Sequence, residues 1–574
     1  MADVEGLLTE RLAPAFAAVA GGPADPGVRR SEHADFQADG ALALARRLGR
    51  SPRDIAADIV EQASLDDLTA SVEISGPGFL NLVLRDDVVG RLAAGMATDE
   101  RLGVPVAASP ETVVVDYSAP NAAKEMHVGH LRSTIIGDAA VRVLEWLGHT
   151  VVRQNHMGDW GTPFGMLIEH LIDVGETEAA YELSVGDLDG FYKAARKKFD
   201  VDEMFRDRSR ARVVLLQGGD ETSRRLWGVL VAESLRYFQT VYDRLHVRLE
   251  PGDVAGESFY NDRLPAVVTD LDRLGLLRDS EGAKCVFPAG FVNRAGDPLP
   301  LIVQKTDEGF GYAATDLAAI RYRIEEVGAT RLLYVVGLPQ RQHLEMVFET
   351  AREAGWLAPP VRAEHVGFGS VLGADGKVLR SRTGASVRLI DLLDEAVVRA
   401  GELIAGKNPD LDEETRAALA DAVAIGAVKY SDLSTQRTKD YVFDWDRMLA
   451  FDGNTAPYLQ YAHTRIRSIL RRAGEDTSGV LDTIEVPEPA ERALALQLLA
   501  FEPAVNKVAE TLEFHRLAEY LYRLATAFTA FYEHCPVLRA EGTTRASRLA
   551  LSDVTGRVLA QGLDLLGIEA PERM

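Results

Sequence analysis

The chain has 574 residues, of which 47% are hydrophobic and 26% are charged, a composition typical of a soluble globular protein with three or four domains. It lacks the run of about 20 apolar residues that a membrane-spanning helix needs. A net charge of −24 argues, on charge alone, against a nucleic-acid partner, because neutralising phosphates requires clustered Lys and Arg. Only Cys285 and Cys535 occur, so paired-cysteine metal sites are excluded and a reducing cytoplasm is the expected location.

The first part of the chain, residues 1–105, predicts a small α+β domain. Helical periodicity is followed by the strand-like stretch LTASVEISGPGFLNLVLR, in which GPG marks a tight turn. Residues 106–395 then alternate short β-branched runs with helix patterns, which predicts a Rossmann-like α/β domain built on a parallel sheet. Charged helix patterns interrupt this alternation and indicate an insertion at about 175–300.

The remainder of the chain is expected to be almost entirely helical. Residues 396–440 are expected to form a helical connector, and residues 441–574 have the length and periodicity of an all-α bundle. Two basic stretches inside the insertion, 193–199 and 206–212, are interpreted as solvated faces of helices.

The stretch NAAKEMHVGHLRS carries the strongest chemical signal. Lys124, His127 and His130 are spaced three residues apart, and a long helix pattern follows. The segment leaves a predicted strand and opens a helix, so unpaired backbone N–H groups and the positive end of the helix dipole are expected to face a ligand. Gly129, between the histidines, would let a flat ring lie against the backbone. A nucleotide, with its phosphates on the lysine and the histidines, fits this pattern best.

Two other interpretations of the histidines stay open. Zinc sites on helices favour i, i+4 spacing with an enclosed glutamate, whereas these histidines are i, i+3 apart and have no evident third ligand. They could also be surface histidines at an ordinary helix start. A P-loop is excluded, because GxxxxGK[ST] does not occur beside them. Donors of this kind favour electrostatic stabilisation of an α-phosphate during in-line displacement.

These residues resemble a known family. HVGH resembles the HIGH signature of class I aminoacyl-tRNA synthetases, and the wider run DYSAPNAAKEMHVGHLRST resembles the arginyl-tRNA synthetases. Similar stretches in the same order, such as QNHMGDWGTPFGMLI, YAATD and DYVFDWDRMLAFDGNTAPYLQYAHTRIRS, extend the resemblance over essentially the whole chain. It implies a ligase that uses ATP with Mg²⁺ to form arginyl-adenylate and then transfers arginine to the 3′ end of tRNA(Arg). It also implies that adenylate formation requires the tRNA.

The resemblance assigns His127 and His130 to the reacting phosphates and Gly129 to the adenine contact. No tightly bound metal held by protein ligands is expected.

The second family signature, KMSKS, is replaced here by GADGKVLRSRTG, which lacks the usual lysine pair. In arginyl enzymes without that pair, a lysine ahead of the histidines is thought to compensate, and Lys124 is that residue here. Lys377, Arg380 and Arg382 are further candidates for phosphate contacts, although a flexible basic loop explains them equally well.

Selection of arginine requires acceptors that match a planar, permanently charged guanidinium, so carboxylates and amide oxygens are expected at strand ends near the nucleotide. Lysine, with a single ammonium group, would leave those acceptors unpaired. The residues that meet both this requirement and the family's pattern for arginine binding are Asp116, Asn121, Tyr312, Asp316 and Gln340. His156 and His343 are expected to support them.

Contacts to tRNA follow from the resemblance in the terminal domains. Phe79 and Asn81 match positions that stack on and hydrogen-bond a base of the D-loop, although Phe79 could equally belong to the core. Tyr458, Tyr461 and Arg465 match anticodon-binding positions and could stack on or pair with unstacked bases. Because the helical domain is net acidic, this interpretation requires a basic stripe on its surface.

The sequence thus predicts a cytoplasmic, monomeric class I synthetase for arginine. One rival is a different class I ligase or nucleotidylyl transferase, which would lack the acidic guanidinium pocket. The other is a catalytically silent tRNA-binding paralogue, which only the altered GADGKVLRSRTG loop favours.

Overall fold

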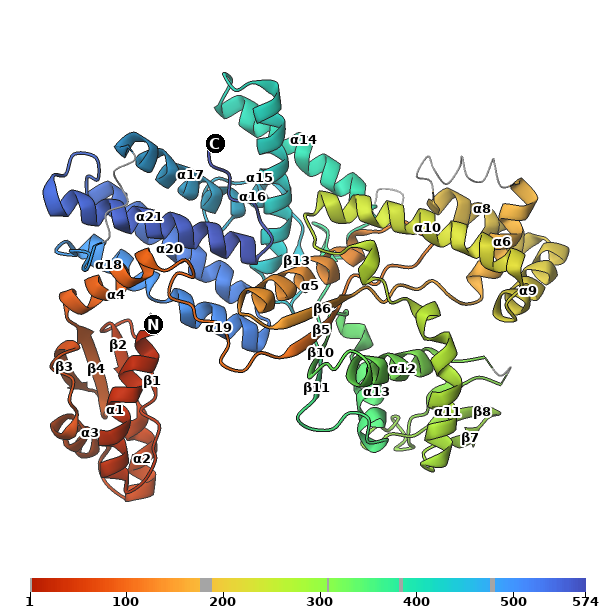
Figure 1. Cartoon of the computed structure of the whole chain (residues 1–574), viewed down its shortest axis with the longest axis horizontal. Coiled ribbons are helices and arrows are strands. Elements are labelled where there is room, and N and C mark those ends of the chain that lie inside the picture. The colour runs from red at the N-terminus through yellow and green to blue at the C-terminus, as the bar shows by residue number, and fades with distance from the viewer. Residues whose placement is uncertain (1–2, 176–187, 307–308, 381–385, 475–480) are drawn as a thin grey trace. The chain divides into compact units, whose positions relative to one another are not determined.

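The computed structural model describes residues 3–175, 188–306, 309–380, 386–474 and 481–574 (Figure 1). The chain folds into two compact units: unit 1 contains Met1–Val106, Ala450–Asp564 and Glu569–Met574, and unit 2 contains Ala107–Leu449 and Leu565–Ile568. The predicted fold class, with an α+β part, a parallel-sheet part and an all-α part, is confirmed. The predicted domain boundaries stay a prediction.

The N-terminal part of unit 1 is built on an antiparallel sheet in the order β1-β2-β4-β3. Its strand β4 alternates, so that Leu80, Leu82 and Leu84 are buried while the residues between them face outward. The elements are α1 (Val4–Ala20), β1 (Val28–Arg30), β2 (Phe36–Ala38), α2 (Gly40–Leu48), α3 (Pro52–Gln62), β3 (Thr69–Ser75), β4 (Phe79–Leu84) and α4 (Asp86–Thr98).

In the C-terminal part of unit 1, all the regular elements among the described residues are helices, joined by loops. Each helix buries an apolar face, as Leu517, Leu521 and Phe528 do on α20, and this pattern produces the predicted bundle. The helices are α17 (Ala456–Ala473), α18 (Pro489–Leu498), α19 (Phe501–Thr511), α20 (His515–His534) and α21 (Gly542–Leu565).

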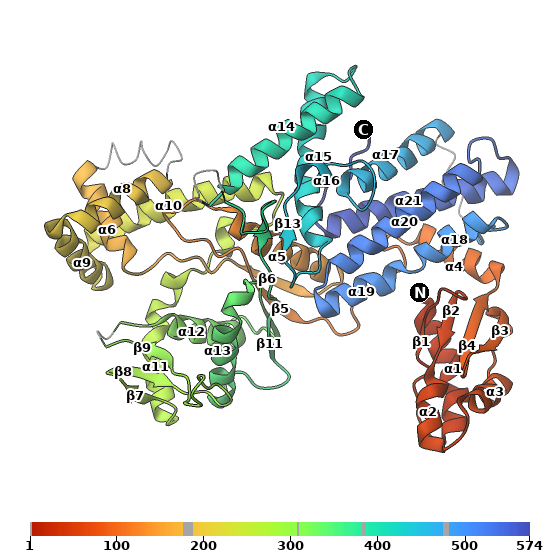
Figure 2. The same ribbon diagram turned by 180° about the vertical axis from the view of Figure 1, so that it is seen from behind.

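Unit 2 contains a parallel sheet in the order β11-β10-β5-β6, seen from behind in Figure 2. Three consecutive valines of the central strand β5 (Thr112–Asp116) are buried, as expected for a strand covered on both faces. After β5 the chain passes through α5 to β6 on one side, and it returns much later to β10 on the other side. This reversal predicts a ligand crevice at the carboxyl ends of β5 and β10.

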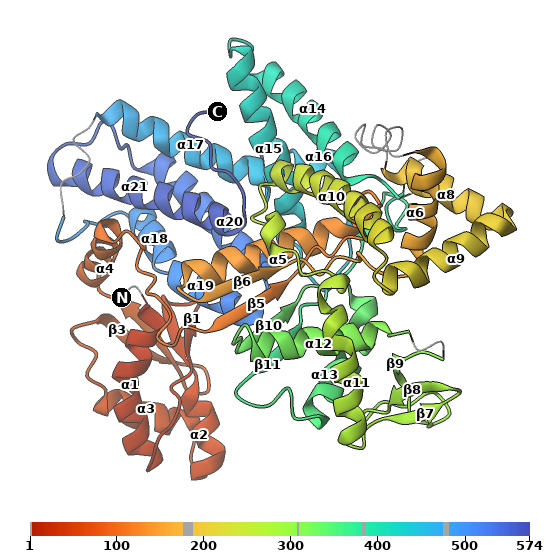
Figure 3. The same cartoon turned by 45° about the vertical axis from the view of Figure 1, so that its right-hand side comes forward.

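The other elements of unit 2 lie around this sheet (Figure 3). The insertion between β6 and β10 contains helices and the antiparallel sheet β7-β8-β9. Up to β10 the elements are α5 (Val128–Trp146), β6 (Thr150–Gln154), α6 (Pro163–Val174), α8 (Leu188–Val201), α9 (Glu203–Gln217), α10 (Glu221–Arg244), η1 (Pro251–Asp253), η2 (Glu257–Arg263), α11 (Leu264–Arg273), β7 (Arg278–Ser280), β8 (Ala283–Val286), β9 (Leu301–Gln304), α12 (Tyr312–Glu325) and β10 (Arg331–Tyr334).

After β10, unit 2 continues with η3 (Leu338–Gln340), α13 (Arg341–Glu353), β11 (Arg362–His365), β12 (Val371–Leu372), α14 (Leu389–Lys407), α15 (Glu413–Leu433), β13 (Tyr441–Val442) and α16 (Trp445–Met448). Strands β12 and β13 pair in parallel. Among the helices within the described ranges, none combines the length and the apolar composition needed to cross a bilayer.

Helix α5 is buried along most of its length, and some of its charged residues are inside. Arg132 of α5 and Asp432 of α15 form an ion pair of 3.0 Å in which each side chain is 1% exposed. Removing one partner of such a pair typically costs about 3–5 kcal/mol, because the other charge is left buried and uncompensated. The helix that begins at the two histidines is thereby fixed to α15.

The short segment Leu565–Ile568 belongs to unit 2, although most of α21, which leads into it, belongs to unit 1. Within it, Gly567 adopts a φ of 67° and its carbonyl oxygen accepts a hydrogen bond of 2.6 Å from Lys429 Nζ. Lys429 is fully buried, and its Nζ also donates to the carbonyl of Leu245 at 2.6 Å. A Cβ added at Gly567 would lie 2.7 Å from this Nζ, which its two carbonyl partners hold in place.

Gly567→Ala is therefore expected to destabilise the protein more than Gly328→Ala, a matched control with a φ of 72° and no atom within 4 Å of an added Cβ. Both variants incur the cost of a left-handed backbone, about 1–2 kcal/mol. Gly567→Ala should lose about 1–3 kcal/mol more, because the new methyl group overpacks the site around Lys429. Chemical denaturation of both variants measures the difference, and equal losses would contradict the assigned contact.

Candidate functional site

The loop between β5 and α5 has an unusual backbone conformation. Ser118, Ala119 and Ala123 have positive φ values of 71°, 47° and 60°, a conformation that costs non-glycine residues energy. Side chains from other elements hold these amides: Ser133 Oγ accepts from Ser118 N at 2.9 Å, Asn155 Oδ1 from Ala119 N at 3.0 Å and Ser234 Oγ from Ala123 N at 2.7 Å. The loop thus delivers Lys124 and His127 to the start of α5 in a fixed conformation.

His127 and His130 cap α5 reciprocally. Nδ1 of His127, the N-cap residue, accepts from Gly129 N at 3.1 Å, and Nδ1 of His130 accepts from His127 N at 3.1 Å. The ring centroids lie 4.1 Å apart. A Cβ at position 129 would lie 2.7 Å from His127 Cε1, so only glycine lets the imidazole lie over this turn. The spacing H-x-G-H is therefore itself a capping device.

Both histidines are neutral near pH 7. Burial lowers the pKa of His127, and the nearby charge of Lys124 lowers it further, while Asp189 opposes the shift. Burial and the neighbouring His127 lower the pKa of His130 to about 3. Because each Nδ1 accepts a backbone N–H, the single proton of each neutral ring resides on Nε2. The mouth of α5 therefore offers two Nε2–H donors and the ammonium group of Lys124.

The expectation of unpaired backbone N–H groups at this helix start is wrong for its first three residues. The amide of Val128 donates to the carbonyl of Val387 at 3.0 Å, and the amide of His130 donates to the carbonyl of His127 at 2.8 Å. The amide of Gly129 is occupied by the imidazole of His127. Side-chain donors and the helix dipole, rather than free amides, make this site suitable for an anion.

The loop that replaces the KMSKS signature returns directly beside the histidines. Its far end pairs with the histidine segment, because Val128 N donates to Val387 O, Leu389 N donates to Met126 O, and Arg388 bonds Glu125 at 3.2 Å. Lys377 and Arg380 are exposed on this loop, and Arg382 lies outside the described residues. The predicted phosphate contacts of all three stay a prediction.

Asp116, at the carboxyl end of β5, is 6% exposed and already has a partner in the fold. Its Oδ2 accepts from Arg323 Nη2 at 2.7 Å, and Nε of the same arginine donates to Gln154 at 2.7 Å. Arg323 is on α12, three turns after Tyr312 and on the same face. Asp116 therefore holds α12 against the end of the sheet, and its predicted direct contact with arginine stays a prediction.

The first turn of α12 lines one side of a cavity of about 530 Å³, whose lining includes Tyr312, Pro339, Gln342 and His343. Asp316 accepts a hydrogen bond of 2.6 Å from His343 Nε2, and this bond raises the pKa of His343.

Tyr312 is 74% exposed, and Gln340, between the cavity residues Pro339 and Gln342, is also exposed. Asn121 is exposed and bridges to Gly158 in the loop after β6.

The carboxylates of Asp116 and Asp316 both lie near Tyr334. Burial raises the pKa of Tyr334, Arg323 opposes the rise, and both carboxylates add to it. Sequence reasoning missed Glu257, whose pKa rises to about 7 through burial and through the charges of Asp159 and Asp316. The acidic residues around Asp316 thus include one that the strand ends did not predict. Glu257 follows an irregular loop, so no periodic pattern marked it.

His156 and His343 differ in their roles. His343 bonds Asp316 directly, whereas His156 lies beside Tyr260, with ring centroids 5.4 Å apart. Among the described residues, no group of three or more His, Cys, Asp and Glu is arranged to hold a metal ion.

Phe79 and Asn81 share the outward face of β4 in unit 1 and are not core residues. Asn81 pairs across the sheet with Gln37, whose Nε2 donates to Asn81 Oδ1 at 2.8 Å. Arg29 on β1 pairs with Gln37 in turn. An aromatic ring on a polar sheet face is suited to stacking on a base.

Tyr461 and Arg465 of α17 form a stack with a residue that sequence reasoning missed. The Arg465 guanidinium lies 4.9 Å from the ring centroid of Tyr461 and 5.3 Å from that of Tyr532 on α20. Tyr461 and Tyr532 are each 41% exposed. Tyr458 is half-buried and its hydroxyl contacts Thr529 at 3.4 Å. Tyr532 follows a run of apolar residues in α20, where a helix pattern alone predicts a core residue.

Three family profiles match the chain. They are described as the catalytic domain of class I (R) tRNA synthetases, over residues 93–445, the DALR anticodon binding domain, over 459–574, and the arginyl-tRNA synthetase N-terminal domain, over 7–84.

Individual proteins are similar over the whole chain. An arginine–tRNA ligase of Thermobifida fusca is 57% identical over 100% of both chains. The solved arginyl-tRNA synthetase of Plasmodium falciparum has a TM-score of 0.86 at 28% identity, over 100% of this chain and 99% of that one. The Thermus thermophilus arginyl-tRNA synthetase has a TM-score of 0.83 at 27% identity, over 100% of both chains.

The matched profiles place a class I catalytic domain around the capped histidines, an arginyl-specific N-terminal domain around Phe79 and an anticodon-binding domain around the Tyr461–Arg465 stack. The structural matches extend over both compact units. This chain belongs to the class I arginyl-tRNA synthetase family, and it is an arginine–tRNA ligase.

Proposed function

We propose that the triphosphate of ATP binds at the mouth of α5, where Lys124 and the Nε2–H groups of His127 and His130 surround the reacting phosphates. The arginine carboxylate attacks the α-phosphate, giving arginyl-adenylate and pyrophosphate. The 2′-hydroxyl of the terminal adenosine of tRNA(Arg) then attacks the arginyl carbonyl and releases AMP. The observation that carries this assignment is the reciprocal capping, which presents two neutral donors at one helix start, near the charge of Lys124.

Neutral histidines suit this chemistry. Negative charge grows on the phosphates in the transition state, and donors already held in place stabilise it without reorganisation. Removing one such donor typically costs about 3–4 kcal/mol of transition-state stabilisation. We assign Mg²⁺ to the phosphate oxygens, because this ion usually keeps several waters and binds with nucleotide phosphates.

We propose that arginine binds in the cavity beside α12, with its guanidinium on Asp316 and with Tyr312, Asn121 and Gln340 at the rim. His343 forms a hydrogen bond of 2.6 Å with Asp316. An incoming guanidinium would replace this single hydrogen bond with charge-assisted bonds to the carboxylate. Burial raises the pKa of Glu257 most, and the charges of Asp159 and Asp316 raise it further, so a cation at Asp316 would relieve repulsion among these carboxylates. Adenine is assigned to the exposed face of Gly129.

We assign the outward face of β4, with Phe79 and Asn81, to the tRNA D-loop. We assign Tyr458 and the stack of Tyr461 and Arg465 to the anticodon. We further propose that the protein acts as a monomer in the cytoplasm, where its two free, buried cysteines would stay reduced.

The function is tested by tRNA charging across the twenty amino acids with unfractionated tRNA. Arginine alone should be attached, and ATP–pyrophosphate exchange with arginine should start only when tRNA is added. Exchange at full rate without tRNA would contradict tRNA-dependent activation. Charging with another amino acid would overturn the assigned specificity.

Asp316→Ala is expected to raise the KM for arginine roughly tenfold to a hundredfold, the cost of losing a hydrogen bond between charged groups. The KM for ATP should change less than about twofold, because the phosphates are assigned to α5. Asp270→Ala is a matched control, since Asp270 also bonds α12, through Arg321 at 2.9 Å, but belongs to α11. A selective defect in the KM for ATP would mean that the pocket holds the other ligand.

The charge state of His130 gives a further prediction. Its ¹⁵N spectrum should show the neutral ring with the proton on Nε2 at pH 7 and still at about pH 5, because its pKa is lowered to about 3. The unfolded state gains this proton near pH 6.5, so His130 should reduce folding stability as pH falls from about 6.5 toward 3. An imidazolium signal from His130 at pH 6 would refute the assignment.

A further inference from the structure

The ammonium group of Lys124 lies on an aromatic ring. Its Nζ is 4.6 Å from the centroid of the Tyr192 ring, inside the limit of about 6 Å for a cation–π contact. Within the described ranges, no carboxylate lies at ion-pair distance from Lys124. Asp189, one turn before Tyr192, pairs instead with Lys193 at 2.6 Å.

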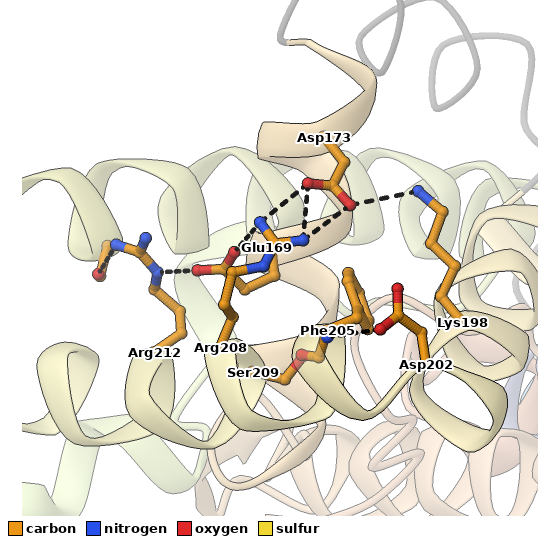
Figure 4. A network of polar contacts seen from close by, with 9 residues as sticks. Glu169, Asp173, Lys198, Asp202, Phe205, Arg208, Ser209 and Arg212 are labelled. Atoms are coloured by element: carbon orange, nitrogen blue, oxygen red, sulfur yellow. Dashed lines mark hydrogen bonds and ion pairs between the residues drawn. The ribbon is translucent and has the colours of Figure 1, made fainter.

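Helix α8, which carries Tyr192, is firmly anchored. Leu188, Phe191 and Ala195 form its buried face. At its other end, Lys198 bonds Asp173 of α6 at 3.5 Å. Asp173 and Glu169 of α6 also bind two arginines of α9, Arg208 at 3.0 Å and Arg212 at 2.7 Å, as Figure 4 shows.

The interpretation of the basic stretch 206–212 as a solvated face is thus partly wrong. Arg212 has a side chain that is only 18% exposed, and it binds Glu169, whose side chain is 5% exposed. These ion pairs bring α6, α8 and α9 together as one support (Figure 4), so the position of the Tyr192 ring is set by the fold.

The backbone beside Lys124 is held by a hydrogen bond to α10, another helix of the insertion. Ala123 N donates to Ser234 Oγ of α10 at 2.7 Å, and this bond holds the positive φ of Ala123. Only the side-chain torsions of Lys124 therefore remain free, and the Tyr192 ring restricts them. A carboxylate partner would compete with phosphates for the ammonium group, whereas an aromatic face holds it weakly and leaves its charge intact.

We propose that Tyr192 is a positioning residue, which holds the ammonium group of Lys124 beside the mouth of α5 both before the phosphates of ATP bind and while they react. This inference rests on the proposed function, in which Lys124 replaces the missing lysines of the KMSKS-like loop. It also assigns the insertion a part in adenylate formation, because Tyr192 and the helices that support it belong to that segment. Tyr192 itself acts through Lys124 and does not touch the reacting atoms.

The test compares Tyr192→Leu with Tyr192→Phe in the full-length enzyme with ATP, arginine and tRNA(Arg). Tyr192→Leu should lower kcat for aminoacylation by about three- to tenfold, the value of one cation–π contact, with the KM for arginine unchanged. Tyr192→Phe keeps the ring and should restore the rate. Phe199→Leu is the matched control, because Phe199 is on the same helix and lies beside Arg196 and Arg206 instead.

A double-mutant cycle separates positioning from a structural role. In a Lys124→Ala background, Tyr192→Leu should have no further effect on kcat. An equal loss in both backgrounds, or a loss of the same size in Phe199→Leu, would overturn the role of Tyr192. If Lys124→Ala alone leaves kcat unchanged, the proposed role of Lys124 fails first, and the inference fails with it.

An NMR measurement tests the contact without any activity. The chain has eleven lysines, so the signal of ¹³Cε-labelled Lys124 can be identified as the one lost in Lys124→Arg. The ring current of Tyr192 should shift the Lys124 ε-protons upfield in the wild type and in Tyr192→Phe, and the shift should vanish in Tyr192→Leu. Unshifted ε-protons in the wild type would rule out the contact.

Discussion

The hydrogen bonds by which the imidazoles of His127 and His130 cap the start of α5 determine the chemistry of this site. Each imidazole uses Nδ1 to cap α5, so each must present Nε2–H outward, and the low pKa of His130 keeps that ring neutral. The same helix is fixed in the core by the buried pair of Arg132 and Asp432. The donors are therefore held in place before any nucleotide arrives, which is the requirement for electrostatic stabilisation of a transition state.

The two substrates are assigned to regions of opposite charge on one sheet. The mouth of α5 carries the cation Lys124 and neutral donors, whereas the start of α12 carries Asp316 with Glu257 nearby. Asp116 links the two, because it ends β5 and holds α12 through Arg323. Phosphates and a guanidinium would each find complementary groups, and the topology of the sheet brings those groups to the ends of β5 and β10.

Much of the fold was readable from the sequence, because β-branched runs and amphipathic helices follow local periodicities, as in β5 and α20. The spacing of Lys124, Gly129 and the histidines also identified the helix start. The pairing of Asp116 with Arg323 was not predictable, since 207 residues separate them and each has an ordinary local context. The hydrogen bond from the Val128 amide to the Val387 carbonyl was not predictable for the same reason. Tyr192 and Tyr532 were missed because a single tyrosine in a helix resembles a core residue.

The central claim is that the capped start of α5 binds the triphosphate beside an acidic pocket for the guanidinium. A crystal structure with arginine and a non-hydrolysable α,β-methylene analogue of ATP tests it most directly. The phosphate oxygens should lie about 2.7–3.2 Å from Nε2 of both histidines and from Lys124 Nζ, with the guanidinium on Asp316. A nucleotide bound away from α5, for example in the cavity beside Tyr312, would contradict the account.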